Sequence, residues 1–103
     1  MYRYMISYDL KNKSTKNDNA IKSCIRSIVD NDDDIWEGLS STCIIKTDKK
    51  PKNIKKHLID SKSIKNTDKL LIVKLHNSAG RGDGDWSQGF NFSDQSWLKN
   101  NFR

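Results

Sequence analysis

Alternating apolar and polar residues at the start of the chain predict a β-strand. Successive side chains of a strand point to opposite faces of its sheet. One face of this strand would carry the aromatic and apolar residues Tyr2, Tyr4, Ile6 and Tyr8. The other face would carry Arg3, Met5, Ser7 and Asp9. We therefore expect the first face to point into the core, and Asp9 to mark the end of the strand beside a polar turn.

Apolar residues at helical spacing predict an amphipathic helix over residues 17–29, capped by Thr15 or Asn17. The positions i, i+3, i+4, i+7 and i+8 are filled by Ile21, Cys24, Ile25, Ile28 and Val29. The acidic run at residues 30–34 should end this helix as a solvated turn, because short polar side chains compete for the backbone. It is not an EF-hand loop, since the alternating ligands, the central glycine and the closing glutamate are missing.

A second helix is predicted to begin near Pro51, whose missing N–H costs nothing in a first helical turn. Ile54 and Leu58 give this helix a narrow apolar stripe. His57 lies beside the stripe, and we expect it to be a packing residue at the edge of the core rather than a base or a metal ligand.

Three further strands complete the pattern. Ile35–Leu39 and Ser41–Thr47 are close enough in sequence to favour antiparallel pairing, and Leu70–Leu75 is the most apolar run of the chain. The order strand, helix, strand, strand, helix, strand predicts an α+β fold of the ferredoxin-like βαββαβ type. We expect residues 1–78 to form this domain, with a four-stranded antiparallel sheet and two helices on one face.

Residues 79–103 form a polar tail that contains many large apolar side chains. These are Trp86, Phe90, Phe92, Trp97, Leu98 and Phe102. Aromatic side chains in such number are not expected to remain in water, so the tail should pack on the domain or on a partner subunit. Residues 93–101 are suited to a short helix.

The net charge of +6 is concentrated in the middle of the chain, where residues 46–69 contain nine lysines and three aspartates. A basic segment of this density favours a polyanionic partner, most commonly nucleic acid. The residues expected to contact RNA or DNA are Lys46, Lys49, Lys50, Lys52, Lys55 and Lys56. The alternative is a lysine-rich helix that is simply solvated.

Compartment and redox state follow from what the sequence lacks. No apolar run approaches the length of a membrane span, and the first residues do not resemble a signal peptide, so a cytoplasmic protein without a membrane partner is expected. Cys24 and Cys43 do not match the spacing of a metal motif, and we expect both to be buried free thiols.

Three segments taken in order resemble the CRISPR-associated Cas2 family, in particular the small bacterial and phage proteins called SinR-like. They are Tyr4–Asp9, the stretch from Trp36 through Thr42 to Thr47, and Asp68–Val73, so the resemblance covers roughly residues 2–75. It implies a ferredoxin-like homodimer in which the tail completes the sheet of the neighbouring subunit. It also implies that Asp9 lies near the dimer axis as a ligand of Mg²⁺, with Ser41 nearby in the catalytic site.

Three functions remain open at this point. The first is a metal-dependent endoribonuclease or deoxyribonuclease, in which two Asp9 carboxylates hold Mg²⁺ and the metal activates water. The second is a non-catalytic dimer that binds nucleic acid or a nucleotide through the same lysines and the aromatic tail. The third is a protein-interaction module of the antitoxin or anti-defence kind, which docks through its open sheet face or a strand edge.

Overall fold

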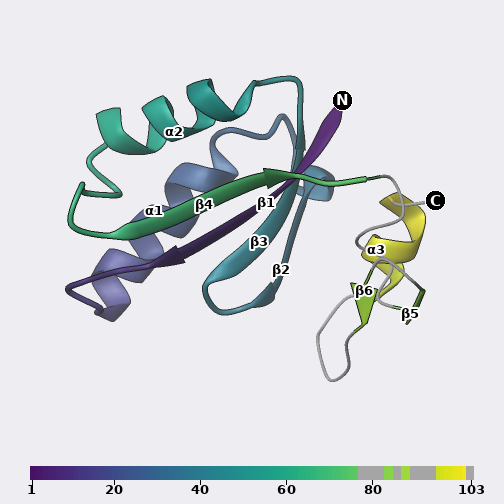
Figure 1. Ribbon diagram of the computed structural model, residues 1–103, viewed down its shortest axis with the longest axis horizontal. Helices are drawn as coiled ribbons and strands as arrows, with labels where there is room; N and C mark the ends of the chain where they lie inside the picture. Colours follow the sequence, from purple (N-terminus) through teal and green to yellow (C-terminus); the bar gives the residue numbers. More distant parts are fainter. Residues whose placement is uncertain (77–82, 85–86, 89–94, 102–103) are drawn as a thin grey trace.

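The computed structural model describes residues 1–76, 83–84, 87–88 and 95–101. The elements of the main body are β1 (Tyr2–Asp9), α1 (Thr15–Arg26), β2 (Ile35–Leu39), β3 (Thr42–Thr47), α2 (Pro51–Asp60) and β4 (Lys69–Lys74). A 3₁₀ helix, η1 (Asp32–Asp34), precedes β2. After β4 follow the short strands β5 (Asp83–Gly84) and β6 (Ser87–Gln88), and then α3 (Gln95–Asn101) (Figure 1).

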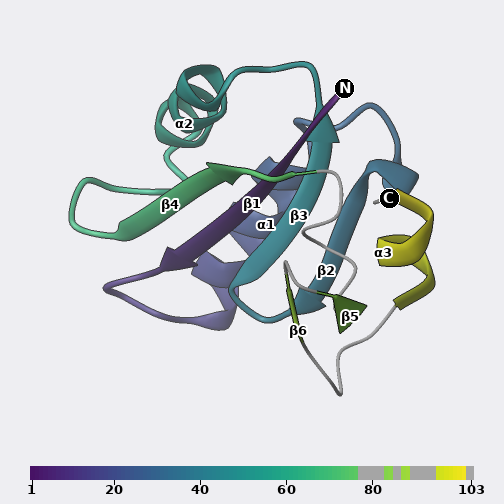
Figure 2. The same cartoon turned by 45° about the vertical axis from the view of Figure 1, so that its right-hand side comes forward.

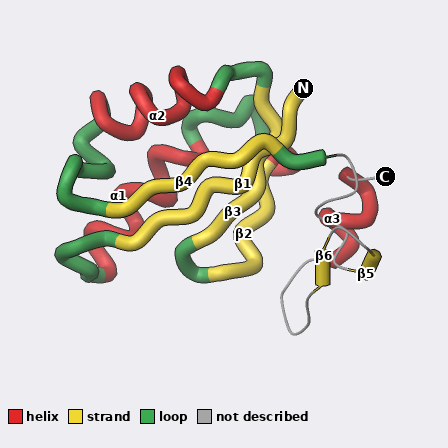
Figure 3. The backbone as a smooth tube through the Cα atoms, in the orientation of Figure 1, coloured by secondary structure: helices red, strands yellow, loops and turns green. Residues whose placement is uncertain are grey.

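The four long strands form one sheet in the order β2-β3-β1-β4, in which every neighbouring pair is antiparallel. Helices α1 and α2 cover one face of this sheet, and β1 and β4 run side by side along it (Figures 1 and 3). The α+β class and the four-stranded antiparallel sheet are thus confirmed, and the arrangement is compatible with a ferredoxin-like fold. The helix count differs from the predicted βαββαβ scheme, because η1 precedes β2 and α3 follows β4.

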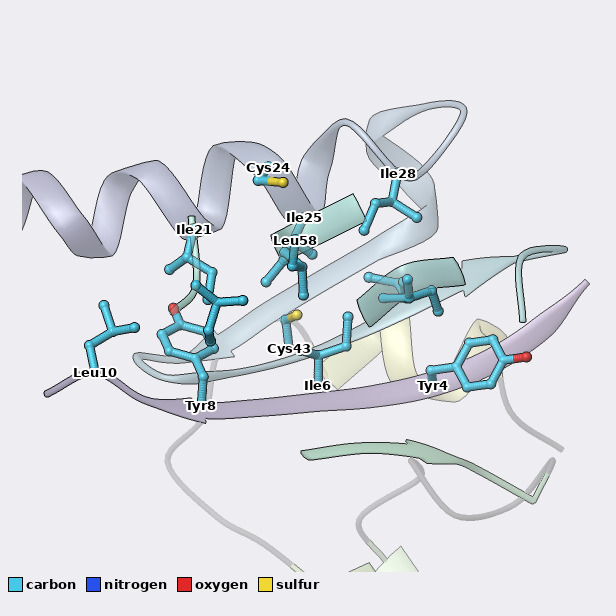
Figure 4. Close-up of a cluster of buried hydrophobic side chains, with 13 residues drawn as sticks. Tyr4, Ile6, Tyr8, Leu10, Ile21, Cys24, Ile25, Ile28, Cys43 and Leu58 are labelled. Atoms are coloured by element: carbon cyan, nitrogen blue, oxygen red, sulfur yellow. The ribbon is translucent and has the colours of Figure 1, made fainter. Parts of the chain in front are cut away.

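The main core lies between the sheet and the two helices. It contains Tyr4, Ile6, Tyr8, Leu10, Ile21, Cys24, Ile25, Ile28, Cys43, Ile45, Ile54, Leu58 and Ile64. Side chains of β1 point toward those of α1 across this layer (Figure 4). Full burial of an isoleucine or leucine contributes about 1.5–3 kcal/mol to folding, so this cluster is the principal source of stability. Both cysteines are buried and free, as predicted.

The start of the first helix differs from the prediction. The cap is Ser14, whose hydroxyl oxygen accepts a hydrogen bond from the backbone N–H of Asn17 at 3.1 Å. Thr15 and Asn17, the two predicted caps, lie inside the first turn. A serine oxygen that reaches an otherwise unpaired N–H fixes the start of a helix more strongly than the apolar pattern does. At the second helix, Pro51 occupies the first turn as predicted.

A second, smaller cluster forms on the other face of the sheet. Ile35 and Ile45 belong to the helix-covered side, so their neighbours Trp36 and Ile44 point the opposite way. Trp97 and Leu98 of α3 pack against Trp36 and Ile44, with Leu75 at the edge. Figure 2 shows α3 on the side of β2. The helix predicted in the tail is therefore present, and it covers the β2–β3 side of this open face. Trp86, Phe90, Phe92 and Phe102 lie outside the described residues.

The acidic run is only partly the solvated turn that its composition predicts. Asp32 and Asp33 are exposed, whereas Asp34 is 6 % exposed and its Oδ2 has no hydrogen-bond partner among the described residues. The nearby helix α3 reaches this turn, because the Trp97 Nε1–H donates to the carbonyl oxygen of Asp33 at 2.7 Å. Long-range packing has enclosed a residue that a local pattern assigns to solvent.

Within the described part of the chain, no helix combines the length and the apolar character needed to cross a bilayer.

Candidate nucleic-acid interface

Asp9 and Ser41, the residues expected to be catalytic, lie at the same end of the sheet. Asp9 is exposed at the end of β1, directly opposite Lys69 of β4. Ser41 is in the turn between β2 and β3, and its carbonyl oxygen accepts a hydrogen bond from the Tyr8 N–H at 3.1 Å. The antiparallel pairing of β1 with both β3 and β4 therefore brings these positions together.

An open hollow of about 210 Å³ lies beside Asp9. It is lined by Ser7, Tyr8, Asp9, Lys69, Leu70 and Leu71. The Ser7 hydroxyl is hydrogen-bonded to the Thr42 hydroxyl at 3.0 Å, and either oxygen can be the donor. One carboxylate, one ammonium and one hydroxyl can bind a small polar group, but they do not make a catalytic set on their own.

The donor set of a single chain does not fit a magnesium site. Mg²⁺ is usually held by one or two carboxylates together with water and substrate oxygens. Asp9 supplies one carboxylate, and the residue facing it across the strands is the cation Lys69. No group of three or more His, Cys, Asp or Glu side chains in the described residues is arranged to hold a metal. A site built on Asp9 would need the carboxylate of a second copy.

The lysines of the basic segment lie on two different surfaces. Lys46 of β3 is half-buried on the open face, where it lies opposite Arg3 of β1. Lys52, Lys55 and Lys56 are exposed on α2, which packs on the opposite face of the sheet. Lys49 and Lys50 are exposed at the N-terminal end of the same helix. The structure therefore groups five of the six predicted contacts and separates Lys46 from them.

Lys52, Lys55 and Lys56 form one face of α2. Residues three and four positions apart are neighbours on a helix, so Lys52 is adjacent to both of the others. The first turn of α2 contains no acidic residue, and the N-cap Lys50 makes no side-chain capping bond. Among the described residues, the ion pairs are those of the N-terminus with Asp48, Lys22 with Asp18, and Arg26 with Glu37. The positive charge of this α2 lysine face is therefore not neutralised within the described part of the chain.

Asp68 positions the start of β4 and therefore Lys69. Its two carboxylate oxygens accept backbone N–H bonds from Lys11 and Lys65, each at 2.8 Å. These two bonds, with that of Lys11 the stronger influence, hold the pKa of Asp68 below its usual range. The sequence analysis did not identify Asp68 as a functional residue. An acidic residue before a strand gives no indication, in sequence alone, that two backbone N–H groups will donate to it.

Tyr8 and Cys43 border the candidate site but are poorly suited to acid–base or nucleophilic chemistry. Burial, followed by the charge of Asp18, raises the pKa of Tyr8, whose hydroxyl donates to Asp18 Oδ1 at 3.2 Å. Burial raises the pKa of the Cys43 thiol to about 12. Both side chains thus stay neutral near pH 7 and act as packing groups.

His57 joins the two helices, in keeping with the packing role predicted for it. Its Nε2 lies 2.9 Å from the Ser27 hydroxyl, and that hydroxyl donates its proton to the Cys24 carbonyl oxygen at 2.5 Å. Because Ser27 has only one proton, its oxygen must accept from the Nε2–H of His57. The pair is therefore a structural link and cannot act as a nucleophile with its base in this arrangement.

Comparison of the chain with protein-family models, with curated proteins and with solved structures finds no match.

Proposed function

We propose that this protein is a nucleic-acid-binding homodimer of ferredoxin-like fold, related to the Cas2-like proteins and working in the cytoplasm. In this proposal the phosphate backbone of RNA or DNA lies along the α2 lysine face. The observation that carries the proposal is that Lys52, Lys55 and Lys56 are exposed side by side without an ion-pair partner in the described chain.

The physical argument rests on the cost of gathering like charges. Two lysines four positions apart destabilise an isolated helix by about 0.2–0.5 kcal/mol. Cations near the N-terminus of a helix also oppose the positive end of its dipole, where anions are favoured. A bound polyanion removes both costs and releases counterions into solution. A face that is unfavourable in the free protein thus becomes favourable in a complex.

The open face supports the dimer. Strand β4 is at an edge of the sheet, and its side chains Leu71 and Val73 are 55 % and 37 % exposed next to the half-buried Met5. Apolar strips that border an unpaired strand edge favour association with another chain. A second copy that covers this strip accounts for its exposure in the single chain.

The test is a salt titration of binding in EDTA, using labelled single-stranded RNA, single-stranded DNA and duplex DNA. For a single strand, each lost phosphate contact reduces the slope of log K against log salt by about 0.7. The double variant Lys55→Gln/Lys56→Gln should therefore lose about 1.4 from that slope. Lys13→Gln/Lys16→Gln, with the same change of charge on exposed positions near α1, should retain the wild-type slope.

Binding that does not depend on salt, or an equal loss of slope in the two double variants, refutes the α2 interface. Recovery of a protein partner with no bound nucleic acid also refutes it, in favour of the interaction-module hypothesis. The comparison among the three ligands decides between RNA and DNA.

A metal-dependent phosphodiesterase is the second candidate, favoured by the shared location of Asp9 and Ser41 at one end of the sheet. Cleavage of labelled RNA and DNA is compared in Mg²⁺, Mn²⁺ and EDTA for the wild type, Asp9→Ala and Ser41→Ala. Metal-dependent cleavage that disappears with Asp9→Ala supports this function. Equal cleavage by the wild type and Asp9→Ala refutes it.

A further inference from the structure

The C-terminal end of α3 contacts two cations on the open face of the sheet. Arg3 and Lys46 lie directly opposite each other on β1 and β3. The backbone carbonyl oxygen of Asn101 accepts a hydrogen bond from Arg3 Nε, and the side-chain oxygen of the same residue accepts one from Lys46 Nζ at 3.0 Å. A single residue of the tail thus supplies an acceptor to both cations.

The same helix also covers an aromatic surface. Trp36 and Ile44 form a cross-strand pair on this face, two residues along β3 from Lys46. Trp97, four residues before Asn101 on α3, is 9 % exposed in the cluster that contains them. We call the surface beneath α3, made by Arg3, Lys46 and Trp36, the capped strip.

The chemistry of the capped strip matches what a single-stranded nucleic acid requires. Proteins of this kind combine cations that follow the phosphates with aromatic side chains on which bases stack. Asn101 offers two neutral oxygens at the positions where a phosphate would offer charged ones, and a charged acceptor adds direct Coulomb attraction to the bonds from the two cations. The indole of Trp97 covers the apolar surface on which a base would stack.

The cap depends on its contacts with the rest of the protein. Helix α3 has seven residues, and a helix much shorter than about 12 residues is not stable alone in water. Its position therefore depends on the buried Trp97 and Leu98 and on the bonds to Arg3, Lys46 and Asp33. A ligand that displaces the helix must replace these contacts.

We propose that the capped strip is a second binding site, for single-stranded nucleic acid, and that α3 occupies it until the ligand displaces the helix. The proposal builds on the proposed function but concerns a different surface, on the face of the sheet away from α2. When a site is open for only a tenth of the time, the apparent affinity falls about tenfold. Loosening the cap should therefore tighten binding, and strengthening the cap should weaken it.

Two variants of the full chain move the cap in opposite directions. Trp97→Ala removes its main anchor while leaving the main core untouched, since Trp97 belongs only to the smaller cluster. Asn101→Asp places a carboxylate beside Arg3 and Lys46, and the attraction between these charges should outweigh the loss of the bond that the Asn101 amide donates to the Trp97 carbonyl oxygen at 2.8 Å. Affinity for labelled oligothymidylate in EDTA should rise by up to about tenfold in Trp97→Ala and fall in Asn101→Asp. Adding Lys46→Ala to Trp97→Ala should abolish the gain.

Far-UV circular dichroism confirms that each variant is folded, and Asn101→Asp provides the test even if Trp97→Ala is not. Affinities equal to wild type in both variants overturn the capped strip while leaving the α2 interface intact. A gain in Trp97→Ala together with an equal loss of salt slope in Lys55→Gln/Lys56→Gln and Lys13→Gln/Lys16→Gln overturns the α2 interface instead, so the two failures are distinguishable.

Discussion

Replacing Asp68 tests how the start of β4 is held beside the candidate site. Its carboxylate joins the loop after β1 to the loop after α2, through N–H bonds from Lys11 and Lys65 at 2.8 Å each. Asp68→Ala removes both bonds. We expect the variant to fold but to be less stable, with β4 and Lys69 less firmly placed opposite Asp9.

The expected magnitude follows from the type and exposure of these bonds. A hydrogen bond to a charged group contributes about 1.5–3 kcal/mol, but both N–H groups are accessible enough to find water when the carboxylate is removed. The loss should therefore be about 1–3 kcal/mol in total for the two bonds. For a domain of this size each kcal/mol lowers Tm by roughly 4–8 °C.

The effect of Asp68→Ala should depend on pH in one direction. Because the two N–H bonds lower the pKa of Asp68 in the folded protein, its stabilising contribution is complete above the unfolded value and is lost as the pH falls through the folded value. The difference between wild type and Asp68→Ala should be full at pH 7 and should shrink below about pH 4.

Urea unfolding followed by circular dichroism from pH 7 down to pH 3 measures this difference. The matched control is Asp60→Ala, which removes an exposed carboxylate at the end of α2 and should change stability by less than about 0.5 kcal/mol. Equal stabilities of the two variants at pH 7, or a difference that does not shrink in acid, would refute the role assigned to Asp68.

Three further changes probe other parts of the fold. Asp34→Asn should raise the free energy of unfolding by about 1–3 kcal/mol, because it removes a buried charge whose Oδ2 has no partner in the described chain; a lower urea midpoint would contradict this. Gly38→Ala should lower the free energy of unfolding by about 1–3 kcal/mol, since a Cβ there would overlap the Trp36 indole. A near-UV circular dichroism spectrum identical to that of the wild type would count against that clash. In a Cys24→Ser background, Cys43 should resist alkylation at pH 8 until urea unfolds the protein, because burial raises the pKa of its thiol to about 12. Rapid labelling of Cys43 in the native state would disprove this prediction.

Local sequence patterns predicted the helices and strands of the main body and the residues that each one buries. Period-two alternation placed Tyr4, Ile6 and Tyr8 in the core, and helical spacing did the same for Ile21 and Ile25. Tyr2 is the exception at 46 % exposure, because it begins its strand at the margin of the cover that the helices provide. A periodic pattern identifies a face but not the extent of the layer above it.

What the sequence did not predict depends on contacts between distant segments. Asp34 is buried in a turn that α3 reaches from more than sixty residues along the chain, through Trp97. Lys46 is separated from the α2 lysine face because strand alternation turns it to the opposite side of the sheet. Charge density along a sequence therefore indicated a polyanion partner, but only the register of β3 against β1 shows that Lys46 faces a different surface.

The link between His57 and Ser27 has a consequence for how a ligand on the α2 lysine face would be held. In that link the imidazole Nε2–H of α2 donates to the hydroxyl of Ser27, the C-cap residue of α1. A ligand bound to the lysines of α2 would therefore pull on a helix that is tied to its neighbour as well as to the sheet. Binding at this face should leave the relative placement of the two helices unchanged.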